Sequence, residues 1–188
     1  MVLGSSPPGP FNRAAALNRA AEGSWDVAVV ADADVVAEAS QVEAAIARAL
    51  ETGRICFAFD VYQGLTAETT RRILSGRRAR WSVGIRYRSK VHESSLVAVP
   101  REAWDRIGGF DPGFEGWGQE DVAFAQAARI LVGPPERVPG IVWHLWHPRA
   151  PERRPELPGF RANQERGARY REARTPEEIR AIRRGTAA

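Results

Sequence analysis

The sequence predicts an α/β fold in which helices flank a mostly parallel central sheet. Two short apolar runs, at 25–31 and 54–60, are typical of strands buried on both faces. Each run is followed by a segment of helical periodicity, at 37–52 and 67–76. Strands that alternate with helices favour parallel pairing, and a hydrophobic content of 44% over 188 residues is enough for a sizeable core.

The N-terminal segment leads into this α/β unit. Residues 4–10 hold three prolines, which fix φ and remove hydrogen-bond donors, so we expect a loop there. Apolar residues then recur at helical spacing over 11–21. We expect residues 1–148 to form one domain, with residues 1–10 as its Pro/Gly-rich lead-in.

The second half of the chain continues the pattern of strands and helices. Strand-like stretches occupy 81–87, 95–99 and 138–142, and helices are expected at 100–107 and 120–131. Gly108 and Gly109 end the first of these helices, because glycine readily adopts the left-handed conformation at a helix C-terminus.

The C-terminal segment, 149–188, is expected to pack on this domain or to extend from it. Residues 148–158 hold four prolines and are predicted to be irregular. Two helices follow, and the second begins after Thr175, because Pro176 and two glutamates then occupy its first turn.

The net charge of +4 is unevenly distributed along the chain. Residues 160–188 hold eight arginines and four glutamates, whereas residues 1–159 hold 19 basic and 19 acidic side chains. Acids spaced among the arginines favour a solvated helical face, and a phosphate backbone or an anionic surface is the alternative partner.

The single cysteine and the hydropathy pattern bear on the compartment. Cys56 lies within an apolar run, which predicts a buried reduced thiol rather than a disulfide. The sequence shows neither a signal-peptide pattern nor an apolar stretch long enough to span a membrane. We therefore expect a cytoplasmic protein.

Two carboxylates follow the predicted strand at 25–31. Asp32 and Asp34 stand where ligands bind in open α/β sheets, and their i, i+2 spacing in an extended chain would direct both to one side. One could hold a divalent cation while the other reaches a ribose hydroxyl or a metal-bound water. The alternative is helix capping, with Asp34 as the N-cap of the helix at 37–52.

Two histidines follow the last predicted strand. Neutral imidazoles at the spacing of His144 and His147 can ligate one ion. The alternative is a pair of histidines packed beside the neighbouring tryptophans. The third histidine, His92, has no comparable partner and is expected to be structural.

Two further acids open the helix at 120–131. Glu120 and Asp121 follow a glycine-rich loop, and a carboxylate there could remove the proton from an attacking hydroxyl while the loop closes over substrate. Helix capping is the alternative. Trp117, between two glycines, could provide an apolar platform for a sugar ring.

These motifs together resemble a known family. The order Phe11-Asn12-Arg13-Ala14 with Asn18, then Asp32-Ala33-Asp34, Gly108-Gly109-Phe110, Gly116-Trp117-Gly118-Gln119-Glu120-Asp121 and His144-Leu145-Trp146-His147 is similar to GT-A glycosyltransferases of the β-1,4-galactosyltransferase type. The C-terminal half also resembles the galactosyltransferase-like segment of polypeptide N-acetylgalactosaminyltransferases. The resemblance runs from about residue 9 to 148.

The resemblance implies roles for the nucleotide-binding residues and for the metal ligands. Phe11 and Arg13 would contact the nucleotide base or its phosphates, Asn18 would fix this segment, and Asp32 would face the ribose. The implied metal ligands are Asp34, His144 and His147, with Mn²⁺ as the leading ion and another divalent cation such as Mg²⁺ as the alternative. His144 stands where galactosyltransferases use a methionine, so the metal preference could differ.

The resemblance also implies the acceptor side and the mechanism. Trp117 and Gly118 would meet the sugars, and Glu120 and Asp121 match the acceptor-side acids, with Asp121 as the base. The implied reaction is direct displacement with inversion, in which a sugar moves from a nucleotide-diphosphate donor, UDP-sugar in the first instance, to an acceptor hydroxyl.

The sequence departs from the family pattern at several positions. Gln119 replaces a family glycine, Val122 and Ala123 replace further acids, and Ser94-Ser95 lies where small residues line the donor sugar. Only about ten residues precede Phe11, so the first βαβ unit is expected to be missing or reduced. The start codon could be misassigned, or a partner chain or homo-oligomer could complete the nucleotide pocket.

Three other functions remain open from the sequence. A non-catalytic remnant of the fold could bind nucleotide or carbohydrate without turnover. A metal hydrolase could use the two histidines and a carboxylate around zinc, although no His-Glu-x-x-His arrangement is present. The arginine-rich tail could associate with nucleic acid, in which case binding would weaken steeply with salt.

Overall fold

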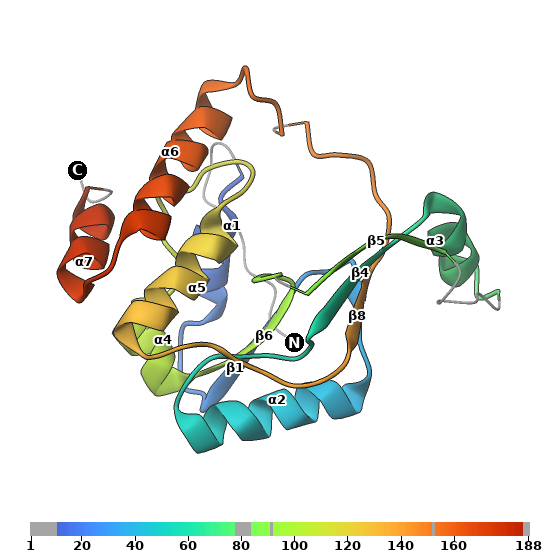
Figure 1. Cartoon of the computed structure of the whole chain (residues 1–188), viewed down its shortest axis with the longest axis horizontal. Helices are drawn as coiled ribbons and strands as arrows, with labels where there is room; N and C mark the ends of the chain where they lie inside the picture. Colours follow the sequence, from blue (N-terminus) through green and yellow to red (C-terminus); the bar gives the residue numbers. More distant parts are fainter. Residues whose placement is uncertain (1–10, 78–83, 91, 152, 186–188) are drawn as a thin grey trace. The chain divides into compact units, whose positions relative to one another are not determined.

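The computed structural model describes residues 11–77, 84–90, 92–151 and 153–185 (Figure 1). The chain divides into two compact units, each built from several segments. The helical unit comprises Met1–Ala28, Pro100–Pro135 and Arg149–Ala188, and the sheet unit comprises Val29–Val99 and Glu136–Pro148. The domain division predicted at residue 148 stays a prediction, although the chain does pass from one unit to the other at that point.

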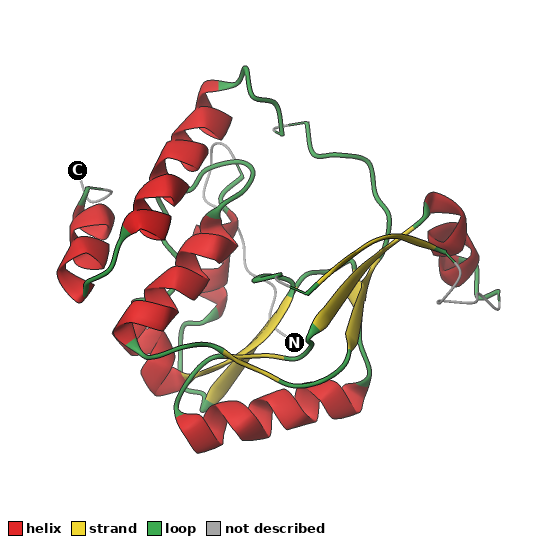
Figure 2. Ribbon diagram, in the orientation of Figure 1, coloured by secondary structure: helices red, strands yellow, loops and turns green. Residues whose placement is uncertain are grey.

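The sheet unit contains two four-stranded sheets, whose strands are drawn in yellow in Figure 2. One sheet has the order β1-β6-β3-β7, formed by β1 (Val27–Ala31), β6 (Leu96–Pro100), β3 (Cys56–Phe57) and β7 (Glu136–Arg137). The other has the order β2-β8-β4-β5, formed by β2 (Val35–Val36), β8 (Ile141–His144), β4 (Val61–Leu65) and β5 (Ile85–Ser89). Each sheet combines parallel and antiparallel pairs.

Two helices accompany these sheets. Helix α2 (Ala39–Thr52) begins with a capping box between Glu38 and Gln41 and ends at Gly53, whose φ of 66° is left-handed. The buried Gln41 side chain also donates to the carbonyl of Ala58, which ties the helix to the chain beyond β3. Helix α3 (Ala67–Leu74) begins at Thr66, whose hydroxyl accepts from the amide of Thr69. Capping groups therefore fix where both helices begin.

Over its described residues, the helical unit is built from five helices: α1 (Arg13–Ala20), α4 (Arg101–Ile107), α5 (Glu120–Leu131), α6 (Pro158–Glu172) and α7 (Pro176–Arg184). Helix α5 buries four alanines, and these small side chains let α4, α6 and α7 pack against it. The rings of Phe110 and Phe124 stack at 4.1 Å, with Trp104 beside both. This aromatic cluster is the core from which the loop at 110–119 departs.

Several predicted elements are confirmed. The α/β class is correct, and the helices expected at 11–21, 37–52, 67–76, 100–107 and 120–131 are present with slightly different ends. Thr175 caps α7 with Glu178 at N3, as its sequence indicated. Cys56 is buried and reduced, and desolvation raises the pKa of its thiol to about 11.

The predicted strands need correction. The sheets are mixed rather than mostly parallel, because the chain returns through β4–β5 and β3–β6 antiparallel pairs. The stretch at 54–60 contributes only Cys56–Phe57, and β4 was not predicted at all. The run at 25–31 is not buried on both faces, since β1 is an edge strand with Val29 40% exposed. The strand expected at 138–142 begins at Ile141, and residues 81–83 lie outside the described residues.

Among the described residues, no helix combines the length and the apolar character that a membrane span requires.

Candidate functional site

The predicted metal ligands lie together in the sheet unit. After β1 the chain turns at 33–34, where the amide of Val35 donates to the carbonyl of Asp32, and then enters β2. Strand β2 pairs antiparallel with β8, with Val35 opposite His144, and the amide of Leu145 donates to the carbonyl of Asp34. This short antiparallel pair brings the turn after β1 against the histidine-bearing end of β8.

The three side chains converge at close range. Asp34 Oδ2 lies 3.3 Å from His144 Nε2 and 3.2 Å from His147 Nε2. The candidate ligand atoms of Asp34, His144 and His147 all lie within 4.8 Å of one another. His147 Nδ1 lies 2.6 Å from the carbonyl of Pro148. Because a carbonyl only accepts, Nδ1 carries the proton, and Nε2 is left to face Asp34.

The histidines also act on the charge of Asp34. The hydrogen bond from His144 lowers the pKa of Asp34 below its usual value, and the charges of both histidines act in the same direction when protonated. Desolvation opposes this shift. The carboxylate is therefore held ionised, as a metal ligand must be.

The donor atoms suit a divalent transition metal. Two imidazole nitrogens and one carboxylate oxygen can bind Mn²⁺, Fe²⁺ or Zn²⁺, whereas Mg²⁺ favours oxygen ligands throughout. The three partly exposed side chains leave positions for ligands from solution, which a closed structural site would not. The residues present thus fit a metal with open coordination positions.

Asp32 is not part of this cluster. The chain between Asp32 and Asp34 forms a turn, so the extended geometry assumed for their i, i+2 spacing is wrong. The amide of Asp32 donates to the carbonyl of Ser95, which places this residue beside the beginning of β6. The capping alternative for Asp34 is also wrong, because Glu38 is the N-cap of α2.

An aromatic column borders the metal-ligand cluster, and the sequence did not reveal it. The ring of Tyr62, from the unpredicted strand β4, lies 5.6 Å from the ring of His144 and stacks at 3.8 Å on His92. Burial lowers the pKa of His92, whose Nε2 contacts the Ser94 hydroxyl at 3.0 Å. His92 is thus a packed neutral histidine, and Tyr62 supports His144 from the side.

The acceptor-side acids lie in the helical unit with a cation between them. Arg13 Nη1 lies 2.7 Å from Asp121 Oδ1 and 3.5 Å from Glu120 Oε1. The side chains are only 13–23% exposed. Arg13 leads α1 and the acids open α5, so an ion pair joins the first turns of two helices. The resemblance implied that Arg13 contacts the nucleotide. In this structure Arg13 is ion-paired with Glu120 and Asp121.

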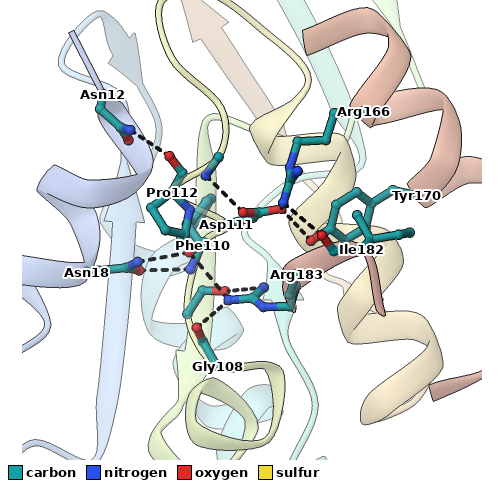
Figure 3. Close-up of polar contacts among 12 residues, drawn as sticks. Asn12, Asn18, Gly108, Phe110, Asp111, Pro112, Arg166, Tyr170, Ile182 and Arg183 are labelled. Carbon is teal, nitrogen blue, oxygen red and sulfur yellow. Dashed lines mark hydrogen bonds and ion pairs between the residues drawn. The ribbon is translucent and has the colours of Figure 1, made fainter. Parts of the chain in front are cut away.

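A buried carboxylate that the sequence analysis missed anchors the loop before these acids (Figure 3). Asp111, 3% exposed, accepts from Arg166 Nε at 2.8 Å, from the Tyr170 hydroxyl at 2.7 Å and from the amide of Gly113 at 2.9 Å. Arg166 and Tyr170 belong to α6. The signal that could have found Asp111 is the Asp-Pro-Gly sequence, which is typical of a turn closed by the aspartate side chain.

Other side chains bind the backbone of the same loop. Asn18 both donates to and accepts from the backbone of Phe110, and Asn12 donates to the carbonyl of Pro112. Arg183 of α7 donates to the carbonyl of Gly108, and Asn163 of α6 donates to the carbonyls of Glu115 and Trp117. Asn18 thus binds the loop at Phe110, and its implied role beside the nucleotide stays a prediction, while Phe11 is 59% exposed just before α1.

The tip of the loop is in contact with the C-terminal segment. The rings of Trp117 and Phe160 stack with their planes 7° apart, and the Arg153 guanidinium lies over Trp117. Gln119 has a left-handed φ of 79°, a backbone conformation that glycine adopts more readily than other residues. An added Cβ at Gly118 would meet nothing within 4 Å.

The predicted site residues thus form two groups. Asp34, His144 and His147 meet in the sheet unit. In the helical unit, Arg13 meets Glu120 and Asp121, and Trp117 precedes them on the anchored loop. The first group offers metal ligands, and the second offers two carboxylates that share one arginine.

Comparison with known proteins bears on both groups. Residues 77–145 match the family model described as the N-terminal domain of galactosyltransferase. The matched segment includes Trp117, Asp121 and His144. The predicted resemblance to galactosyltransferases is confirmed over this segment, and the mixed α/β architecture confirms the predicted α/β class.

Curated sequences and solved structures provide the other comparisons. Among curated protein sequences, no relative was found. The crystal structure of GalNAc-T7 with UDP, GalNAc and Mn²⁺ is similar to this chain at 14% sequence identity, with a TM-score of 0.48. The similarity covers 87% of this chain and 38% of that chain, so this chain spans well under half the length of the solved structure.

Proposed function

We propose that this chain is a metal-dependent glycosyltransferase that moves a sugar from a nucleotide-diphosphate donor, a UDP-sugar, to an acceptor hydroxyl with inversion. The galactosyltransferase match over 77–145 supports the reaction class. The convergence of Asp34, His144 and His147 within 4.8 Å is the observation that carries the metal dependence. Two imidazole nitrogens and one carboxylate oxygen within this range form a ligand set that divalent transition metals accept.

Asp34, His144 and His147 would hold the ion, Mn²⁺ first and another divalent cation such as Mg²⁺ as the alternative. A divalent ion bound there would supply positive charge for the diphosphate of the donor. The hydrogen bond from His147 Nδ1 to the Pro148 carbonyl fixes the tautomer that presents Nε2. Asp34 contributes the negative charge of the site, and Tyr62 orients His144 by ring contact.

Asp121 is the proposed base. It would accept the proton of the acceptor hydroxyl while the oxygen bonds to the anomeric carbon and the bond from that carbon to the diphosphate oxygen breaks. Arg13 keeps Asp121 and Glu120 close together as anions. Trp117, whose ring stacks on Phe160 and lies under the Arg153 guanidinium, would meet the acceptor sugar, and the Asp111 network would keep this loop in position before substrate arrives.

Phe11, Asp32 and Gly118 keep their implied roles as predictions, in contact with base, ribose and sugar respectively. A cytoplasmic location, a homo-oligomer and a partner chain that completes the nucleotide pocket also stay predictions.

The test is calorimetric titration with UDP, GDP and their sugar conjugates, each with and without Mn²⁺. We expect binding that requires the metal, prefers UDP and is lost in Asp34→Ala and His147→Ala. Asp105→Ala is the matched control, because Asp105 is an exposed acid that pairs with Arg101 along its own helix, α4. Metal-dependent binding without turnover, unaffected by Asp121→Asn, would instead support a non-catalytic remnant. No nucleotide binding under any condition would contradict the proposal.

A further inference from the structure

We propose that the acceptor carries an anionic group, a carboxylate or a phosphate, and that Arg153 binds this group beside Trp117. The inference rests on the proposed function, because it names the substrate class for the acceptor side of that site. It also assigns a role to the arginine-rich C-terminal segment, which the proposed mechanism leaves unused.

The geometry of Arg153 suits an anion. Its guanidinium carbon lies 4.5 Å from the centre of the Trp117 ring. A guanidinium that lies over an aromatic face is held by cation–π attraction, while its N–H edges stay available around the plane. Those edges match the spacing of two oxygens on a carboxylate or phosphate, and such bidentate pairs are strong and specific.

The platform beneath Arg153 is fixed in place. The Trp117 ring stacks against Phe160 with a centroid separation of 5.9 Å, and its carbonyl accepts from the buried Asn163 at 3.1 Å. The guanidinium is therefore presented from an ordered aromatic pair rather than from a freely rotating chain. Less conformational entropy is lost when an anion binds to such a group.

The charge balance around the loop leaves Arg153 available. Arg153 is exposed and has no acidic partner within the described part of the chain. Of the acids that flank Trp117 in the sequence, Glu120 and Asp121 have Arg13 as their cation, and Glu115 is exposed to solvent. Arg171 brings a second exposed guanidinium to the loop, where it donates to the Gln119 side chain. Positive charge thus flanks the residues that precede the proposed base.

Acceptor sugars that differ only in charge provide the test. The probes are methyl glucuronide, glucose 6-phosphate and the neutral methyl glucoside, titrated without donor or metal. Binding is followed through the indole N–H signal of Trp117 in tryptophan-labelled protein, assigned by comparison with Trp117→Phe. We expect at least one anionic sugar to bind about tenfold more tightly than the neutral one, the effect of roughly one charge-assisted pair. Added NaCl should reduce this difference.

Variants locate the effect. Arg153→Gln should remove the tenfold preference, while Arg169→Gln, an exposed arginine of α6, should retain it. Both positions are exposed, so both variants should fold, which thermal unfolding verifies. A preference for just one of the two anionic sugars also supports the proposal, and it shows whether the bound group is a carboxylate or a phosphate. Equal binding of charged and neutral sugars, or equal loss in both variants, overturns it. Because donor and metal are absent, this result is independent of the UDP and Mn²⁺ titrations.

Discussion

Arg13 Nη1 lies 2.7 Å from Asp121 Oδ1, although the two residues stand 108 positions apart in the sequence. The pair joins the first turn of α1 to the first turn of α5, and it is largely shielded from water. Arg13 also lies 3.5 Å from Glu120, so one cation serves two carboxylates. Removal of Arg13 would leave the adjacent carboxylates of Glu120 and Asp121 without this cation.

The first prediction concerns this pair. We expect Arg13→Gln and Asp121→Asn to be coupled by about 1 kcal/mol in a double-mutant cycle of unfolding free energy, because each variant deletes the same partly buried interaction. Urea denaturation of the four proteins measures this coupling. Free energies that add to within about 0.3 kcal/mol would show that the pair contributes nothing.

The second prediction concerns the anchor of the loop. Asp111→Asn should lower the free energy of unfolding by about 3 kcal/mol, because it removes the buried charge that pairs with Arg166, whose side chain is only 13% exposed. Tyr170→Phe, which removes one hydrogen bond to the same carboxylate, should cost about 1.5 kcal/mol. Urea denaturation provides both values. Arg161→Gln, an exposed change on α6, is the control and should stay within about 0.5 kcal/mol of the parent.

The third prediction concerns Asn163, which we expect to position the loop before α5 rather than to stabilise the fold. Its side chain donates to the carbonyls of Glu115 and Trp117, directly before the acids of α5. Asn163→Ala should therefore raise the KM for acceptor by about tenfold and leave metal-dependent UDP binding unchanged. Steady-state kinetics with varied acceptor and calorimetry with UDP give the two readings. A parallel loss of both would indicate that the variant has merely weakened the fold.

The fourth prediction concerns the pH dependence of the metal-free protein. The pKa of Asp34 is lowered mainly by its hydrogen bond from His144, so His144→Gln should raise it toward the ordinary value. A lowered folded pKa contributes stability that is present above the unfolded pKa and is lost as pH falls through the folded one. His144→Gln should therefore shift this loss of stability to higher pH. Carboxyl ¹³C NMR titration measures the shift, and an unchanged Asp34 midpoint would contradict the assigned cause.

The fifth prediction concerns Cys56. Burial raises the pKa of its thiol to about 11, so at pH 8 about one molecule in a thousand carries the reactive thiolate, and solvent has no access to the sulfur. We expect no reaction with a disulfide reagent in the native protein and one thiol per chain after denaturation. Rapid reaction of the native protein would show that the strands around β3 open readily.

Local signals in the sequence predicted the helices well. Thr66 and Thr175 mark helix beginnings through their own side chains, and Gly108 ends α4 through its left-handed conformation. These interactions span at most four residues, so a single sequence carries them in full. Strand β4 escaped because Gln63 and Gly64 interrupt its apolar pattern. Both are buried, and Gly64 is needed because the Tyr87 ring occupies the space of a Cβ.

The candidate site likewise combines residues that the sequence predicted with contacts that arise only when distant segments meet. The identities of Asp34, His144 and His147 were predicted from strand ends and from the family resemblance, but their convergence depends on the β2–β8 pairing between distant segments. The Asp111 network could not be predicted, because its partners on α6 come into range only through helix packing. The pairing of Arg13 with Asp121 likewise depends on how α1 meets α5, which no local pattern encodes.

The central claim is that Asp34, His144 and His147 form one metal site, and direct Mn²⁺ binding tests it most directly. Electron paramagnetic resonance of free Mn²⁺, titrated with the protein, should show one ion bound per chain. Asp34→Ala and His147→Ala should each abolish this binding, while Asp105→Ala should retain it. Equal Mn²⁺ binding in all four proteins, or none in the parent with UDP present, would contradict the account.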